Sequence, residues 1–188
     1  MTAVPTHVAL LRGINLGPHK RVAMPALRTL VESLGHTDVA TYIASGNVVF
    51  TGSGSTSSLA AELEKAIADE LGVSCRIVVL TSDELAAAHA ANPYPDEPDP
   101  KRVHAFFLTS EADAQAREHV ATAQERAAAK GSHDKATIIG KVLYLHTPDG
   151  FGRSELAAEL SKGGKRNAAE GTARNWATVT KLLSMCKA

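Results

Sequence analysis

The sequence predicts an α+β protein built from two tandem βαββα(β) units, with mainly antiparallel sheets and a C-terminal helix. Three observations indicate this class. In each half, short β-rich runs alternate with apolar residues at helical spacing. Two segments recur at one fixed offset along the chain, which is typical of an internal duplication. Between the halves lies a proline-rich stretch in which neither a helix nor an internal strand forms.

The composition predicts a folded cytoplasmic protein. The 188 residues suit one compact domain or two small ones, and the hydrophobic content of 44% supports a buried core. Aromatic residues make up only 4%, and abundant alanine favours helices packed on a sheet. No apolar run approaches the length of a membrane span, and no secretory signal is visible, so no membrane partner is expected. The two distant cysteines, Cys75 and Cys186, fit reduced thiols.

The first half, residues 1–91, is predicted to run strand, helix, strand, strand, helix, strand. The apolar run Val8–Leu11 is the first strand. Pro25 suits the first turn of a helix, and Gly35 ends that helix. The short turn at 44–47 joins two β-rich segments as a hairpin. The other predicted features are strands at 39–43, 48–50 and 76–80, a helix with Leu59, Leu63, Ile67 and Leu71 on one face and Gly72 at its end, and a capping box of Thr81 and Glu84.

The segment 92–100 is predicted to be a linker, because it contains four prolines in nine residues. The second unit then occupies 101–188. His7 and His104 each precede an apolar run, and the sequence Leu-Ala-Ala-Glu-Leu occurs at 59–63 and again at 156–160, so both matches are 97 residues apart. A Gly-Lys turn at 140–141 joins predicted strands at 136–139 and 142–145.

The end of the second unit is predicted to differ from the first. A helix from Asn175 to about Cys186 stands in place of a last strand, with Asn175 as its N-cap. Trp176 is expected to pack against the second sheet rather than stack on a ligand. The preceding stretch 162–171, basic and rich in glycine, is expected to be mobile.

Two polar corners indicate a binding site. The segments Leu-Leu-Arg-Gly-Ile-Asn-Leu-Gly at 10–17 and Thr-Tyr-Ile-Ala-Ser-Gly-Asn at 41–47 each end an apolar run. In a split βαβ arrangement the first two strands run the same way, so both corners lie at one end of the sheet. The residues this brings together are Arg12, Asn15 and Lys20 beside Ser45 and Asn47.

The chemistry of these corners favours an anion. Asn15 and Asn47 tolerate left-handed backbone and offer amide donors. The glycines at 13, 17 and 46 permit positive φ and close backbone approach, and a helix N-terminus follows. Arg12, His19, Lys20 and Arg21 add positive charge. A phosphorylated small molecule or a nucleic-acid backbone suits such a place. The alternative is that the glycines and asparagines serve only the turns.

Other kinds of site are not indicated. The histidines and cysteines do not have metal-ligand spacing, so neither a metal nor a cofactor is predicted. The glycines fit neither dinucleotide nor P-loop patterns, and no nucleophile elbow is present. The first and third strands lack the stacking aromatics of an RNA-recognition domain, apart from Phe50.

Charge is divided unevenly along the chain. Residues 1–100 hold 6 Lys and Arg against 11 Asp and Glu, whereas residues 101–188 hold 14 against 9. The basic second half fits either an anionic partner or attraction between the two halves. Arg174 lies in this basic part, and we expect it to reach back to the polar end of the first unit and join the ligand-binding set.

Taken together, the two corner segments, Asn-Pro-Tyr-Pro at 92–95 and Thr-Ala-Arg-Asn-Trp-Ala-Thr-Val-Thr-Lys-Leu at 172–182 resemble the bacterial family known as domain of unknown function 1697. The resemblance implies an α+β protein with ferredoxin-like halves and implies no established activity. Ala173 departs from the threonine of the family pattern. The family motif positions are Arg12, Gly13, Asn15, Gly17, Ser45, Gly46, Asn47, Arg174, Asn175 and Trp176.

Three functions remain open from the sequence. The first is a cytoplasmic protein that binds an anionic ligand at the corner. The second is an enzyme that uses the corner as a phosphate or oxyanion site, with His19 as the nearest acid or base in the sequence to Ser45. The third is a structural protein that oligomerises through exposed sheet edges. The sequence does not define the oligomeric state.

Overall fold

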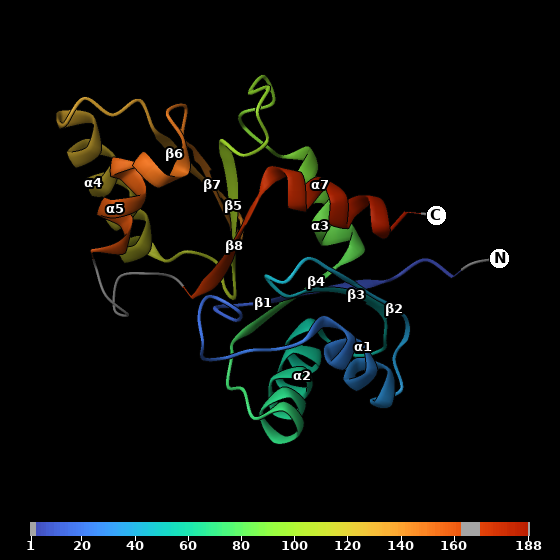
Figure 1. The fold of residues 1–188 in the computed structure, drawn as a ribbon. Coiled ribbons are helices and arrows are strands. Elements are labelled where there is room, and N and C mark those ends of the chain that lie inside the picture. The colour runs from blue at the N-terminus through green and yellow to red at the C-terminus, as the bar shows by residue number, and fades with distance from the viewer. Residues whose placement is uncertain (1–2, 163–169, 188) are drawn as a thin grey trace. The chain divides into compact units, whose positions relative to one another are not determined.

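The structure is a computed structural model that describes residues 3–162 and 170–187. Its contacts form two compact units, one containing the chain up to Ala90 and the residues from Thr180 on, the other Ala91–Val179. Each unit carries helices and one four-stranded antiparallel sheet, which confirms the predicted α+β class (Figure 1). The three-part division at 1–91, 92–100 and 101–188 stays a prediction.

The first unit has the strand order predicted for a split βαβ arrangement. Its sheet runs β2-β3-β1-β4, with every neighbouring pair antiparallel. Figure 1 shows α1 and α2 on one side of this sheet and α3 on the other. The elements are β1 (His7–Leu11), α1 (Met24–Ser33), β2 (Thr37–Tyr42), β3 (Asn47–Thr51), α2 (Thr56–Leu71), β4 (Ile77–Thr81) and α3 (Ser82–Ala90).

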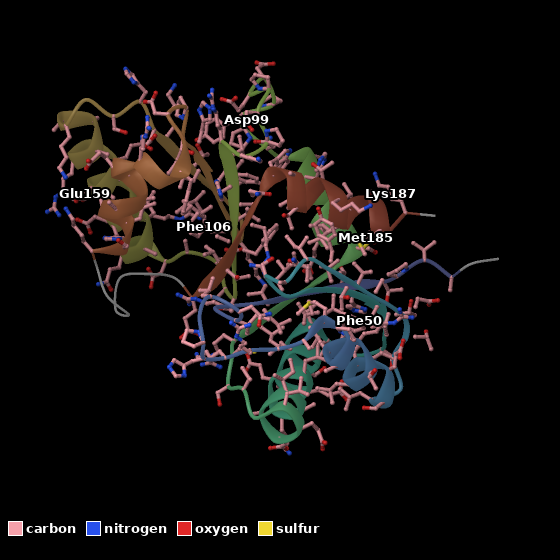
Figure 2. All side chains as sticks on the ribbon, viewed as in Figure 1. Phe50, Asp99, Phe106, Glu159, Met185 and Lys187 are labelled. Atoms are coloured by element: carbon pink, nitrogen blue, oxygen red, sulfur yellow. The ribbon has the colours of Figure 1, made fainter. Side chains whose placement is uncertain are left out.

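The core of the first unit lies between its sheet and helices α1 and α2. Leu27 of α1 and Leu63 of α2 are fully buried against alternate residues of β1, Ala9 and Leu11. Phe50 of β3 belongs to the same cluster and is labelled in Figure 2. The apolar faces of the two helices and one face of the sheet therefore meet in one apolar layer.

The helix ends follow the predicted capping chemistry. Gly72 has φ of 67° and closes α2, as only glycine does without strain. The backbone N–H of Glu84 donates to Thr81 Oγ1 at 3.1 Å, and the N–H of Thr81 donates to the Glu84 carboxylate at 2.9 Å. This reciprocal pair confirms the predicted capping box at the start of α3.

The second unit repeats the topology with the order β6-β7-β5-β8. Its helices α4 and α5 cover one face, where Phe106 packs against a cluster containing Leu145 and Leu156 (Figure 2). Gly140 turns the predicted hairpin with φ of 57°. The elements are β5 (Val103–Leu108), α4 (Ala114–Ala129), β6 (Lys135–Ile139), β7 (Val142–His146), a 3₁₀ turn (Phe151–Arg153), α5 (Glu155–Ser161), β8 (Gly171–Asn175) and the beginning of α7 (Trp176–Met185).

One prediction for the second unit is wrong, because a last strand is present. Strand β8 pairs with β5 and leads directly into α7. Its buried side chains are Thr172 and Arg174 rather than apolar residues, so the apolar alternation that marks a strand is missing. The cap is as predicted, since Asn175 Oδ1 accepts from the N–H of Thr178 at 2.9 Å. Of the stretch expected to be mobile, 163–169 lies outside the described residues.

The proline-rich segment 92–100 packs on the second unit. The Tyr94 ring stacks on His146 with 5.1 Å between centroids, and its hydroxyl lies 2.9 Å from Thr137 Oγ1. His146 Nε2 contacts the Glu97 carboxylate at 2.7 Å, and this hydrogen bond is the main reason why the pKa of Glu97 is lowered. Trp176 packs at 6.2 Å from the ring of Tyr144, as predicted for a side chain that rests on the second sheet.

His104 predicts a pH dependence of stability. Its ring lies 4.3 Å from that of Phe151, its buried Nδ1 has no hydrogen-bond partner among the described residues, and burial lowers its pKa from 6.5 to about 4. Below pH 6.5 His104 becomes protonated in the unfolded chain but stays neutral in the folded one. The free energy of unfolding therefore falls as the pH is lowered from 6.5 towards 4.

The expected result for His104→Phe, which keeps an aromatic ring, is a shallower loss of the unfolding free energy over this range. Urea unfolding of both proteins at several pH values measures it. Parallel pH profiles for the two proteins would contradict the assignment.

Candidate functional site

The two polar corners of the first unit lie side by side at one end of its sheet. The N–H of Leu11 donates to the carbonyl of Gly46 at 2.9 Å, and Leu10 is paired with Asn47 in the ladder between β1 and β3. The loop 12–22 that follows β1 is therefore adjacent to the turn between β2 and β3. This adjacency is the spatial condition on which the predicted site depends.

Asn15 holds this arrangement together. Its Nδ2 donates to the carbonyls of Val22 at 2.9 Å and Ala44 at 2.8 Å, while its Oδ1 accepts from the N–H of Val22 at 2.9 Å. Its own backbone N–H donates to the Lys20 carbonyl at 3.0 Å. Asn15 has φ of 54°, a left-handed conformation that asparagine tolerates. Its amide group thus fixes the loop on itself and on the turn.

Asn47 performs a similar task inside the hairpin. It is fully buried, and its Nδ2 donates to the Tyr42 carbonyl at 2.9 Å and to Ser45 Oγ at 3.0 Å. Both amide hydrogens therefore have acceptors within the unit. The side-chain amides of Asn15 and Asn47, two of the predicted ligand residues, therefore hold the loop and the turn in place.

We call the two adjoining segments, the loop 12–22 and the turn 43–46, the corner. Its exposed part is cationic. The side chains of Arg12 and Lys20 are exposed, and neither forms an ion pair with any described residue. His19 and Arg21 are exposed in the same loop, and Ser45 is exposed across from it in the turn. The backbone of Arg12 is nevertheless fixed, because its N–H donates to the Arg76 carbonyl at 2.9 Å. An anion approaching this end of the sheet meets exposed cationic side chains on a backbone that is held by hydrogen bonds.

Backbone conformation agrees with the sequence at some positions only. Gly13 and Gly46 have positive φ, of 69° and 90°, as predicted. Gly17 does not, and Asn47 does not adopt the left-handed conformation. Instead Ile43 does, with φ of 50°, although nothing in the sequence predicts a left-handed residue there. A β-branched residue rarely adopts this conformation because its side chain meets the backbone.

The N-terminus of α1 adds little to the corner. The helix begins after Ala23, which supplies no side-chain cap, and Pro25 occupies its first turn as predicted. Proline lacks an N–H, so one donor of the four free at a helix N-terminus is missing here. The structure therefore concentrates the positive charge in the loop.

A groove of about 530 Å³ adjoins the corner, and sequence analysis missed it. Lys20, Glu64, Cys75 and Arg76 are among its lining residues. Burial and the Glu64 carboxylate raise the pKa of the Cys75 thiol, while Lys20 opposes this shift. The Glu64 carboxylate also accepts from the N–H of Ile77 at 2.9 Å. The carboxylate is paired with Arg76 at 3.4 Å. The protonated thiol is a weak nucleophile.

Arg174 lies in β8 of the second unit and is largely buried, with 8% of its surface exposed. Its Nη1 donates to Thr172 Oγ1 at 2.9 Å and to the Ala173 carbonyl at 2.8 Å. Burial lowers its pKa to about 10, which leaves it charged at neutral pH. Its predicted place in a ligand-binding set stays a prediction.

Two further features bear on the class of site. Within residues 3–162 and 170–187, no three histidine, cysteine, aspartate or glutamate side chains are grouped so that they could hold a metal ion. In the same ranges, no helix combines the length and apolar character needed to cross a bilayer.

Fold and site together define an α+β protein of two βαββαβ units, one of which presents a rigid, cationic loop at the end of its sheet. The chain belongs to the family described as protein of unknown function (DUF1697), whose model matches residues 4–144. No curated protein matches it.

A solved structure shares the fold. The conserved bacterial protein SP0830 from Streptococcus pneumoniae superposes with a TM-score of 0.71 at 23% identity, over 98% of this chain and 100% of that one. At this identity the likeness concerns the fold alone.

Proposed function

We propose that the first unit binds an anionic ligand at the corner, through the side chains of Arg12 and Lys20 and the hydroxyl of Ser45. The main support for this proposal is that Arg12 and Lys20 are exposed and form no ion pair with any described residue. Both lie on a loop that the Asn15 side chain fixes in place. Ordering a loop in advance reduces the entropic cost of binding. Asn15 and Asn47 act as positioning residues.

The ligand class is a phosphorylated small molecule or the backbone of a nucleic acid. A guanidinium offers paired donors that match phosphate oxygens, and an ammonium adds a point charge. We place the protein in the cytoplasm, in keeping with its two free cysteines, Cys75 and Cys186. We also assign both units to the ferredoxin-like class, on the strand orders β2-β3-β1-β4 and β6-β7-β5-β8. Arg174 is kept as a proposed contributor to ligand binding.

The test is a thermal-shift screen with inorganic phosphate, nucleotides, sugar phosphates and short RNA and DNA, followed by titration calorimetry of the hits. Arg12→Ala is expected to weaken binding about 10-fold or more, because a hydrogen bond to a charged group contributes roughly 1.5–3 kcal/mol. Affinity is also expected to fall as salt rises.

Arg28→Ala is the matched control, since Arg28 is an exposed arginine of the same unit that pairs with Glu32 on α1. Binding that survives Arg12→Ala, or that falls equally with Arg28→Ala, would contradict the proposal. Unfolding of the Arg12→Ala protein, visible by circular dichroism, would assign Arg12 a structural role instead.

A further inference from the structure

Two apolar side chains are exposed at the corner. Leu16 is 86% exposed and Ile43 is 49% exposed. They flank one hydrogen bond, because Leu16 follows Asn15 and Ile43 precedes Ala44, and Asn15 Nδ2 donates to the Ala44 carbonyl at 2.8 Å. Single exposed apolar residues are ordinary, but these two lie on adjacent segments that one hydrogen bond joins. We name Leu16, Ile43, Arg12 and Lys20 the corner patch.

Folding of the unit does not explain these two residues. Leu16 buries almost nothing, so it contributes little to the core. Ile43 has φ of 50°, where asparagine or glycine would be less strained. Exposed strain and exposed apolar surface in one place are features of a surface that a partner covers.

The charges of the corner patch indicate what covers it. The first unit, residues 1–90 and 180–188, holds eight Lys and Arg and eight Asp and Glu, so without Arg12, Lys20 and Arg21 five bases stand against eight acids. Positive charge is thus local, on a unit that is otherwise acidic. An extended polyanion such as a membrane surface or a long duplex would be repelled by the remainder of that unit. A short acidic segment would meet the cations alone.

We propose that the corner patch binds an acidic segment of another protein, one in which Asp or Glu side chains flank an apolar side chain. The carboxylates pair with Arg12 and Lys20, and the apolar side chain covers Leu16 and Ile43. This inference rests on the proposed anion site, because the partner's carboxylates use the same cations. It adds an apolar contact that neither phosphate nor a nucleic-acid backbone supplies.

The test is selection of a displayed library of random peptides on the full-length protein. The expected result is recovery of peptides that place Asp or Glu beside Leu, Ile or Phe. The recovered peptides are then synthesised and their binding is measured by fluorescence anisotropy. We expect them to bind the Leu16→Ser protein about 10- to 100-fold more weakly than wild type, as loss of one buried leucine contact implies.

Val4→Ser is the matched control, because Val4 is an exposed apolar residue of the same unit outside the corner, at 38% exposure. Ile43→Asn removes the second apolar contact with a residue that tolerates left-handed backbone, so weaker binding by that variant is not attributable to misfolding. Equal binding to wild type and Leu16→Ser, or no recovered peptide, would overturn the inference. Leu16-dependent binding to phosphatidylglycerol vesicles or duplex DNA would overturn it as well.

Inorganic phosphate separates the two proposals. Leu16→Ser is expected to leave any thermal shift caused by phosphate unchanged, since Leu16 carries no donor. A retained phosphate shift without Leu16-dependent peptides would mean that this inference alone fails. Absence of both would mean that the anion site fails too.

Discussion

Asn15→Ala is expected to destabilise the first unit by about 2.5–5.5 kcal/mol. The substitution removes three side-chain hydrogen bonds, to the N–H and carbonyl of Val22 and the carbonyl of Ala44. A net hydrogen bond contributes about 0.5–1.5 kcal/mol, and alanine in left-handed backbone costs roughly 1 kcal/mol more than asparagine. Urea unfolding followed by circular dichroism measures the change.

Asn15→Gly is the control that separates the two contributions. Glycine adopts φ of 54° without strain, so this variant loses the hydrogen bonds alone and is expected to fall between wild type and Asn15→Ala. The loop 12–22 is also expected to exchange its amide hydrogens faster in both variants. If Asn15→Ala lowered the free energy of unfolding by less than about 1 kcal/mol, the Asn15 side-chain hydrogen bonds would not be a main support of the corner.

Gly46→Ala is expected to cost about 2–5 kcal/mol, because the new methyl group has no room. A Cβ at this position would lie 2.7 Å from Ile14 Cδ1 and 2.9 Å from Leu11 Cβ. Ile14 and Leu11 are each only 1% exposed, so neither moves without disturbing the core. Overpacking of this kind costs roughly 1–3 kcal/mol, and the φ of 90° adds about 1–2 kcal/mol for any residue with a Cβ.

Gly13→Ala is its matched control. Gly13 also has positive φ, of 69°, yet a Cβ there would meet no atom within 4 Å. Its cost is therefore expected to be the backbone part alone, about 1–2 kcal/mol. Thermal or urea unfolding of the two variants side by side gives the difference. Equal losses of unfolding free energy in the two variants would mean that Ile14 and Leu11 can shift to make room for the methyl group.

The sequence predicts those parts of the fold that depend on local chemistry. Helix α2 ends at Gly72 and α3 begins at the Thr81–Glu84 box because caps and glycine conformations act over a few residues. Strand β8 escapes prediction because its buried positions hold Thr172 and Arg174, whose burial depends on the pairing with β5. Pairing between strands that are distant in the sequence produces no periodic pattern of residues along the chain.

The candidate site shows the same division. The sequence predicts that the two corners meet, since strand direction alone decides this. It does not show that the amides of Asn15 and Asn47 are occupied by backbone carbonyls, because the acceptors Ala44 and Tyr42 become neighbours only through the turn geometry. Nor does it show the exposure of Leu16 or the strain at Ile43, which sit within apolar-looking stretches.

The bond from Asn15 to Ala44 spans 29 positions of the chain. A contact between positions this far apart exists only while the strands between them are paired, so we expect the loop to lose its shape when the unit unfolds. The unfolded chain accordingly has no preformed place for a ligand. Any molecule that docks there selects the native state, and the midpoint of thermal denaturation should climb with its concentration.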